Sequence, residues 1–252
     1  MRSRLLIEYD GTEFAGWARQ PGKRTVQEEL ERALGVVLRA PDGAGPALTV
    51  AGRTDAGVHA LGQVASYQGP PAQLRSLNGL LPDDVAVLES APAPAGFDAR
   101  HDATSRAYRY LLLNRPARSA VRRGRVLHWP RRLDVDALVA CAAALAGRHD
   151  FTAFTPRETH HVRFEREVFS AAWDRHEDGV LEFSIEADVF MRHMNRVLVG
   201  TMLEVASGRR SIDSFVALLD GKPRSAAGQT APAHGLYLVG VGYAGERVLG
   251  RG

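Results

Sequence analysis

The residues best suited to chemistry lie in the segment AGRTDAGVHA, residues 51–60. Asp55 stands between two apolar stretches, and Arg53 precedes it by two positions. In an extended segment these two side chains face the same side, and a nearby guanidinium favours the ionised carboxylate that a nucleophile needs. Gly52 and Gly57 permit backbone angles that other residues avoid, so the loop can bend sharply and present the acid. Spacing alone leaves two interpretations open, a catalytic aspartate or an ordinary turn Asp paired with its neighbouring Arg.

Two further regions carry candidate functional groups. Tyr108 and Tyr110 lie two apart in a strand pattern and so share a face, where aromatic residues usually pack; a neutral phenol of pKa ~10 is a poor base unless its surroundings change it. Arg196 lies in a mostly apolar helical stretch, where a guanidinium must find a carboxylate or stay at the rim. His59 and His193 have no carboxylate or cysteine at ligand spacing, so no metal site is expected and both are interpreted as structural or RNA-contacting.

The basic residues are almost all arginine and are unevenly spread. Of 32 basic residues only Lys23 and Lys222 are lysine. Between Arg100 and Arg132 the sequence carries ten arginines and one acid, Asp102. Such a band can grip phosphates, although an arginine-rich solvated surface would give the same pattern.

Composition narrows the class of protein. With 252 residues, 45% of them hydrophobic, the chain can bury a sizeable core in one large or two small domains. No run approaches the roughly 18 apolar residues that a membrane span needs, and the N-terminus lacks the apolar core of a signal peptide, so a cytoplasmic protein is expected. The single cysteine, Cys141, lies in an apolar stretch and is interpreted as a core residue rather than a nucleophile.

Periodicity predicts two successive sets of elements. The first contains strands at 4–9, 47–51, 63–68 and 85–90, a helix that a Thr25 to Glu28 capping box starts and that runs to about 39, and a short helix at about 71–80. The second contains strands at 107–114, 162–175, 180–186 and 236–243, helices at 135–146 and 189–207, and an extra short helix at 212–219.

Both sets read βαββαβ, which predicts an α+β fold, an α/β sandwich of two ferredoxin-like or RNP-like domains. The predicted domains are residues 1–103, which carry the Asp55 loop, and residues 104–252. Their sheets are expected to flank a central cleft in which RNA could lie. An ordinary RNA-recognition motif is disfavoured, because the strand 63–68, QVASYQ, lacks its aromatic pattern.

Several strings, in order along the chain, carry a specific resemblance. Residues 52–59, GRTDAGVH, match the signature of the TruA family of tRNA pseudouridine synthases. The chain also resembles this family at LIEYDGTEFAGWARQ (6–20), TVQE (25–28), LNGLLP (77–82), FDAR (97–100), YRY (108–110), FMRHMNRVLVG (190–200) and GLYL (235–238). The resemblance covers roughly residues 4–243. Departures are the run 60–62, Asp98, and Asn195 beside Arg196.

The resemblance implies a role for each candidate. Asp55 would be the catalytic acid, and Tyr108 would stack on the target base and accept a proton later in the reaction. Arg196 would pair with Asp55, Arg53 would hold the target nucleotide out of its stack, and His59 would contact the substrate. The implied substrate is uridine at positions 38, 39 and 40 in the anticodon stem-loop of tRNA, and the implied assembly is a homodimer.

Isomerising uridine to pseudouridine involves no net redox change and no transferred group, so no cofactor and no metal is expected. The sequence leaves open whether the carboxylate adds covalently or removes a sugar proton to give a glycal. Two other classes also stay open, a non-catalytic RNA-binding protein and an aspartate-dependent hydrolase of a small nucleoside. A synthase acting on other RNA positions is the nearer competitor, and the string 52–59 speaks against it.

Overall fold

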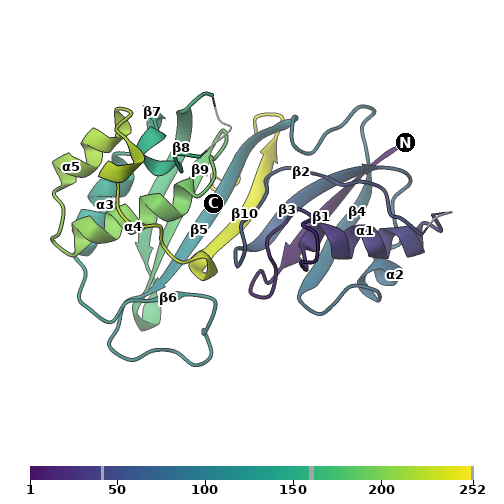
Figure 1. Ribbon diagram of the computed structural model, residues 1–252, viewed down its shortest axis with the longest axis horizontal. Helices are drawn as coiled ribbons and strands as arrows, with labels where there is room; N and C mark the ends of the chain where they lie inside the picture. Colours follow the sequence, from purple (N-terminus) through teal and green to yellow (C-terminus); the bar gives the residue numbers. More distant parts are fainter. Residues whose placement is uncertain (41–42, 159–161, 251–252) are drawn as a thin grey trace. The chain divides into compact units, whose positions relative to one another are not determined.

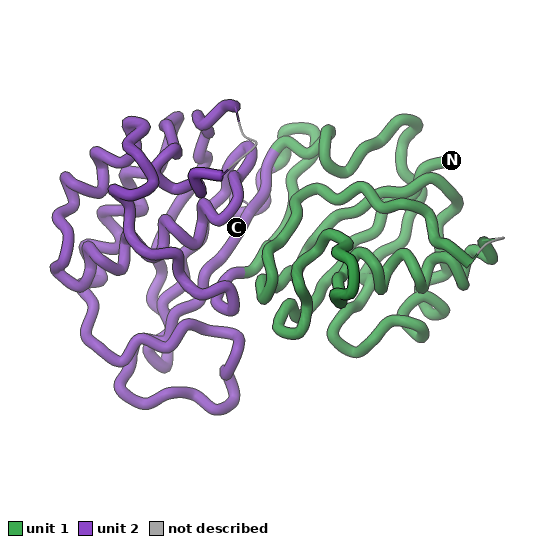
Figure 2. Tube along the Cα trace, viewed as in Figure 1, with its two compact units in different colours: residues 1–104, 237–246 green, residues 105–236, 247–252 purple. Residues whose placement is uncertain are grey.

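The computed structural model describes residues 1–40, 43–158 and 162–250, and its contacts divide the chain into two compact units (Figure 2). Unit 1 contains residues 1–104 and 237–246, and unit 2 contains residues 105–236 and 247–252. The division predicted between residues 103 and 104 places the last strand in the second domain. The contacts instead group residues 237–246 with unit 1, because β10 (Leu236–Tyr243) pairs with a strand of that unit.

Unit 1 has the element order expected from the sequence. Its elements are β1 (Arg2–Tyr9), α1 (Val26–Val37), β2 (Thr49–Val50), β3 (His59–Gln68), α2 (Leu74–Asn78) and β4 (Val85–Ala93). The strands lie in the order β4-β1-β3-β10, and β2 also pairs with β3. β10 is parallel to β3, whereas the other pairs are antiparallel. Figure 1 shows α1 and α2 in front of this sheet.

Alternation and helical spacing explain the core of unit 1. In β1, Leu5, Ile7 and Tyr9 are buried, while the residues between them are more exposed. On α1 the residues Val26, Leu30, Ala33 and Leu34 are fully buried. Burying each large apolar side chain contributes about 1.5–3 kcal/mol, so the period of 2 in the strand and of 3.6 in the helix decide which faces meet.

The predicted capping box of α1 is wrong. Thr25 is the N-cap, but its side chain accepts no capping hydrogen bond, and among the described residues none pairs with its buried hydroxyl. Carbonyls of the preceding loop take over, because Val26 N–H donates to Gly16 O at 3.3 Å and Gln27 N–H to Trp17 O at 3.1 Å. These bonds satisfy orphan donors of the first helical turn and tie the helix to the loop before it.

Unit 2 contains the second set of elements except for its last strand, β10. They are β5 (Ala103–Leu113), β6 (Leu127–His128), α3 (Val135–Ala143), β7 (Gly147–Asp150), β8 (Glu165–Arg175), β9 (Val180–Ala187), α4 (Met194–Ala206), α5 (Ile212–Val216) and the 3₁₀ turns η1 (Thr152–Phe154), η2 (Glu177–Gly179), η3 (Ala217–Leu219), η4 (Arg224–Ala226) and η5 (Ala233–Gly235). The strands lie in the order β5-β9-β8-β7 with antiparallel pairing, and β6 pairs with β5. The helices α3, α4 and α5 pack on one another, and α3 packs on β8.

Helix α4 begins at Met194, five residues after the predicted start at 189. His193, its N-cap, has φ 62 and ψ −2, a left-handed conformation that a helix cannot continue through. Periodicity does not detect such a break, because Phe190 and Met191, which precede it, continue the apolar pattern of the helix that follows it. Residues 189–193 therefore lie outside the helix, with a turn at 192–193, and only the part from Met194 to Ala206 is helix.

The α+β class is confirmed by the mixture of mainly antiparallel strands with few helices. Cys141 is fully buried, as predicted, and burial raises the pKa of its thiol to about 11, so it is inert at neutral pH. Within the ranges 1–40, 43–158 and 162–250, no helix combines the length and the apolar character needed to cross a membrane.

Candidate active site

The Asp55 loop, residues 51–58, joins β2 to β3 and closes on a tight turn. Val58 N–H donates to Asp55 O at 3.1 Å, and Gly57 has φ 76 at the third position of this turn. A type II turn needs a positive φ there, which glycine adopts at little cost. The conformational freedom predicted for Gly57 is therefore used, whereas Gly52 does not adopt a positive φ.

The opening segment, residues 10–17, supports the Asp55 loop from one side. Trp17 N–H donates to Thr54 O at 3.0 Å, and Gly57 N–H donates to Phe14 O at 3.4 Å. Gly16 has φ 104, and a Cβ at this position would lie 2.9 Å from Thr54 O and 3.2 Å from Asp55 C. The main chain on both sides of Asp55 is thus fixed by a neighbour that only glycine allows to come so close.

A buried polar network supports the loop from below. The hydroxyl of Tyr9 lies 2.7 Å from Thr54 Oγ1, and Gln63 Nε2 donates to Gly52 O at 2.6 Å. Tyr9 and Gln63 are almost completely buried. Burial raises the pKa of Tyr9 to about 12 against the opposing effect of hydrogen bonds with Thr54 and Gln63, so its hydroxyl stays protonated at neutral pH.

Tyr9→Phe tests this network. Removing the hydroxyl leaves Thr54 Oγ1 without its buried partner and is expected to cost about 1–3 kcal/mol of unfolding free energy at pH 7. The Tyr9 pKa is raised on folding, so its contribution is complete below pH ~10 and is lost toward pH ~12 as the unfolded chain ionises first. Denaturant titrations should show that the difference in unfolding free energy between wild type and variant becomes smaller as the pH rises from ~10 to ~12. Tyr243→Phe, which removes a 2.8 Å bond to Ala99 O, is the control.

The three candidates in unit 1 differ in accessibility. Arg53 is exposed and Asp55 is half-buried, as required of groups that meet a substrate. His59 is only 2% exposed and is the first residue of β3, which begins earlier than predicted. Its Nδ1 lies 3.1 Å from Gly11 N and 3.0 Å from Asp10 Oδ1. Nδ1 accepts from Gly11 N–H when it carries no proton and donates to Asp10 Oδ1 when it does, so either form ties the opening segment to β3.

Unit 2 places the two tyrosines in different surroundings. Tyr108 is 7% exposed and makes an edge-to-face contact with Phe190, with ring centroids 5.1 Å apart. Tyr110 is completely buried, and its hydroxyl donates to Pro232 O at 2.9 Å. Burial raises the pKa of Tyr110, against the opposing charge of Arg196. Tyr110 is therefore an anchored core residue, a distinction that the shared face of the two residues could not provide.

Arg196 lies in the first turn of α4 and is half-buried. Its Nε donates to Ala231 O at 2.7 Å, and its own carbonyl accepts from Ala231 N at 3.0 Å. Of the five residues predicted for the site, Arg53, Asp55 and His59 thus belong to unit 1, and Tyr108 and Arg196 to unit 2. The supporting residues Tyr9, Gln63 and Gly16 were not predicted. Tyr9 and Gly16 lie in the string 6–20 that resembles the family, which could have suggested these two.

The arginine band is heterogeneous. Arg106 is buried and donates to Asp188 O at 3.0 Å, Arg115 donates to Ala117 O, and Arg122 lies 3.8 Å from Asp178. The exposed members are Arg100, Arg118, Arg123, Arg125, Arg131 and Arg132. The band can therefore present cations to a phosphate backbone mainly through its second half, the long connection between β5 and α3 seen in Figure 1.

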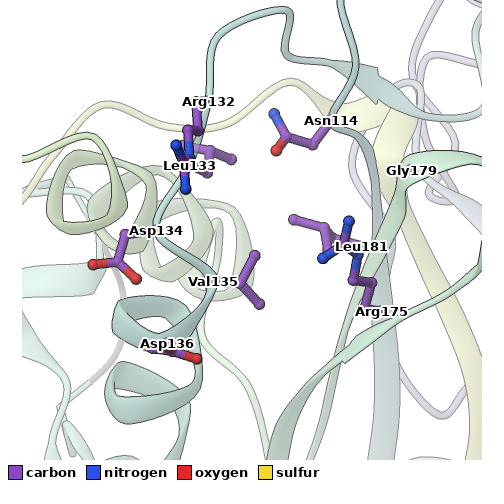
Figure 3. A pocket seen from close by; sticks show the side chains of 9 residues that line it. All are labelled: Asn114, Arg132, Leu133, Asp134, Val135, Asp136, Arg175, Gly179 and Leu181. Atoms are coloured by element: carbon purple, nitrogen blue, oxygen red, sulfur yellow. The ribbon is translucent and has the colours of Figure 1, made fainter.

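A cavity of about 800 Å³ lies in unit 2, between the end of β5, the start of α3, the end of β8 and the start of β9 (Figure 3). It is lined by Asn114, Arg132, Leu133, Asp134, Val135, Asp136, Arg175, Gly179 and Leu181. None of the predicted site residues lines it, so this cavity is not the candidate active site. In the part of the chain that the structure describes, no group of three or more His, Cys, Asp and Glu side chains could hold a metal ion.

Comparisons with known proteins agree with one another. The family described as tRNA pseudouridine synthase matches residues 141–244. A tRNA pseudouridine synthase A of Frankia casuarinae is 46% identical over 249 residues, covering 96% of this chain and 89% of the relative. The Bacillus subtilis protein of that name is 41% identical over 248 residues, with 96% and 99% covered. That of Leifsonia xyli is 41% identical over 273 residues, with 99% and 94% covered. This chain therefore belongs to the tRNA pseudouridine synthase A family and is an isomerase that acts on tRNA.

Proposed function

We propose that this enzyme isomerises uridine to pseudouridine at positions 38, 39 and 40 of the anticodon stem-loop, with Asp55 as its catalytic acid. The observation that carries the proposal is the Asp55 loop. Its half-buried carboxylate belongs to a main chain that is hydrogen-bonded on both sides, by Trp17 N–H to Thr54 O and by Phe14 O to Gly57 N. A group held in this way is preorganised for attack, which an ordinary surface turn does not require.

The reaction breaks the bond from N1 of uracil to C1′, turns the base, joins C5 to C1′, removes the proton from C5 and leaves a proton on N1, so that no atom is gained or lost. Asp55 acts in one of two ways, by adding to the sugar or base or by taking a sugar proton, and a second group accepts the C5 proton. The target base must leave its stack, which costs about a few kcal/mol. Neither step needs a cofactor or a metal ion.

The other residues receive the following roles in the complex with tRNA. Tyr108, whose ring is held by Phe190, stacks on the target base and accepts the C5 proton. Arg196 is the cation that pairs with the Asp55 carboxylate, and the exposed Arg53 helps to hold the target nucleotide out of its stack. His59 is 2% exposed, so its proposed contribution to substrate binding is to hold the opening segment beside the Asp55 loop.

The setting of the enzyme is also part of the proposal. Each unit is a ferredoxin-like domain, as suggested by the order β1-α1-β2-β3-α2-β4 in unit 1 and the set β5-α3-β8-β9-α4 in unit 2. The enzyme works as a homodimer in the cytoplasm, where its tRNA substrate is. The RNA-binding cleft predicted between the two domains stays a prediction.

The test is incubation of the purified protein, without added cofactor or metal and with a chelator present, with unmodified tRNA transcripts. Pseudouridine is then located position by position. Product at 38, 39 or 40 is the expected result. Pseudouridine only at other positions would contradict the proposed target positions but support the proposed reaction. Release of free uracil would indicate a hydrolase. Tight binding of tRNA without product would indicate an RNA-binding protein.

Phosphate contacts by the arginine band predict a steep dependence of tRNA binding on salt. Each phosphate contact contributes a slope of about −0.7 to −0.9 in log K against log salt concentration, because counterions are released on binding. Replacing Arg118 and Arg123, both exposed, by alanine should weaken binding and reduce the slope by about 1 for each phosphate that is no longer neutralised. Filter binding across a salt series measures both quantities.

Arg75→Ala is the matched control, because Arg75 is an exposed arginine outside the band, on α2. It should leave affinity and slope close to wild type. An equal loss of affinity per substituted arginine in Arg75→Ala and in the double substitution would show that net charge alone matters and that the band has no special part in binding.

A further inference from the structure

A short stretch of unit 2, the bracing segment (residues 228–232), is fastened along helix α4 at two levels. Near one end, Gly228 N–H donates to Thr201 Oγ1 at 3.0 Å, and the Thr201 hydroxyl itself donates to Val197 O at 2.7 Å. Near the other end, Ala231 N–H donates to Arg196 O at 3.0 Å. These bonds hold the irregular backbone of the bracing segment against α4. The fully buried Thr201 side chain makes the one at Gly228.

The contact between the bracing segment and α4 is unusually close. A Cβ on Gly200 would lie 1.8 Å from Gln229 O and 3.3 Å from Ala231 N. Glycine at position 200 is therefore required by the approach of the segment to the helix, even though it lowers helix propensity. Ala231 is 4% exposed, so the segment is part of the packed interior at this point.

The last two carbonyls of the bracing segment accept hydrogen bonds from the side chains of Arg196 and Tyr110. Ala231 O accepts from Arg196 Nε at 2.7 Å, which fixes the plane of the guanidinium and thus the direction of its two Nη groups. The next carbonyl, Pro232 O, accepts from the buried Tyr110 hydroxyl at 2.9 Å. Gly235, just beyond, has no room for a side chain, since a Cβ there would lie 2.7 Å from the Tyr110 ring.

We propose that the bracing segment orients Arg196 for catalysis, and that Tyr110 and Thr201 are positioning residues that hold the segment in place. The proposal rests on the function proposed above, in which Arg196 acts on Asp55. The Ala231 carbonyl can hold the guanidinium in one position only if the main chain around Ala231 is itself held in place. Thr201 binds that main chain before Ala231, at Gly228, and Tyr110 binds it after Ala231, at Pro232.

The experiment compares Tyr110→Phe and Thr201→Val with wild type in tRNA isomerisation, with thermal unfolding as the stability readout. Misplacing a catalytic group by about 1 Å can cost on the order of a hundredfold, so kcat is expected to fall about tenfold to a hundredfold while KM changes little. Thr201→Ser, which keeps the hydroxyl, should restore kcat. Tyr67→Phe is the matched control, because Tyr67 is also fully buried and also donates to a prolyl carbonyl, Pro70 O at 2.8 Å.

Tyr67→Phe should lower the unfolding temperature at least as much as Tyr110→Phe, because the Tyr67 hydroxyl also accepts from Ala72 N–H at 3.0 Å, and it should leave kcat unchanged. Arg196→Lys lacks the Nε donor. In that background Tyr110→Phe should cause no further loss of kcat, because Tyr110 acts only by orienting the Arg196 guanidinium. An unchanged kcat in Tyr110→Phe, an equal loss in Tyr67→Phe, or full additivity with Arg196→Lys would each overturn the proposal. A wild-type enzyme that makes no pseudouridine would instead overturn the proposed function.

Discussion

Asp55→Asn is expected to bind tRNA with close to wild-type affinity and to form pseudouridine at least about 10³-fold more slowly, since removing a group that carries out the bond-making step typically costs this much or more. The amide has nearly the shape of the carboxylate, so the Asp55–Val58 turn, which uses only main-chain atoms, should survive. Single-turnover rates with excess enzyme measure the chemical step, and filter binding measures the affinity.

The control is Asp83→Asn, which removes one negative charge from an exposed position of the same unit. It should change neither quantity, which separates loss of the catalytic group from a general change in charge. Because an asparagine can hydrolyse back to aspartate, Asp55→Ala is measured beside it and should be equally inactive. Substantial turnover by Asp55→Ala would reject Asp55 as the catalytic residue.

Gly16→Ala is expected to have the second-largest effect. The added methyl group would meet Thr54 O at 2.9 Å and Asp55 C at 3.2 Å, and φ 104 is a region that alanine rarely adopts. The loop must shift by a few tenths of an ångström or more to make room, and a displaced nucleophile loses its alignment with the target. A fall in kcat of about tenfold to a hundredfold is expected, with KM less affected.

Gly22→Ala separates strain from displacement. Gly22 also has a positive φ, 68, but a Cβ there would have no neighbour within 4 Å. It should lower the unfolding temperature and leave kcat near that of wild type. If both variants lose the same activity, backbone strain in the segment before α1 explains the loss, and direct pressure on the Asp55 loop does not.

The sequence predicted the order of the main elements well, because they have clear periodicity. The strand 236–243 was predicted with its observed ends, since GLYL and the apolar run after it have no competing interpretation. Asp55 and Arg53 were selected from a string whose glycine at position 57 is required by the turn. The strand 236–243 and the turn at Asp55 are determined by residues close together in the sequence, so a sequence pattern can predict them.

Other features depend on contacts and backbone angles that the hydrophobic pattern does not contain, and they were missed. Thr25 and Glu28 have the spacing of a capping box, yet carbonyls of Gly16 and Trp17 supply the cap instead. The left-handed conformation of His193, which delays the start of α4, leaves no trace in the hydrophobic pattern. The burial of His59 likewise follows from its stacking on Tyr237, with ring centroids 4.6 Å apart, a partner 178 positions later that no periodicity indicates.

The assignment of β10 to unit 1 has a consequence for how the protein is made. The chain leaves unit 1 after residue 104 and returns only at residue 237, so on the ribosome the first unit waits for its last strand until most of the second unit has been synthesised. Until then, the edge of β3 that receives Tyr237 and Leu238 is open to other strands. A fragment cut at residue 104 would keep this open edge permanently. The nascent chain therefore has a defined interval in which protection from aggregation matters most.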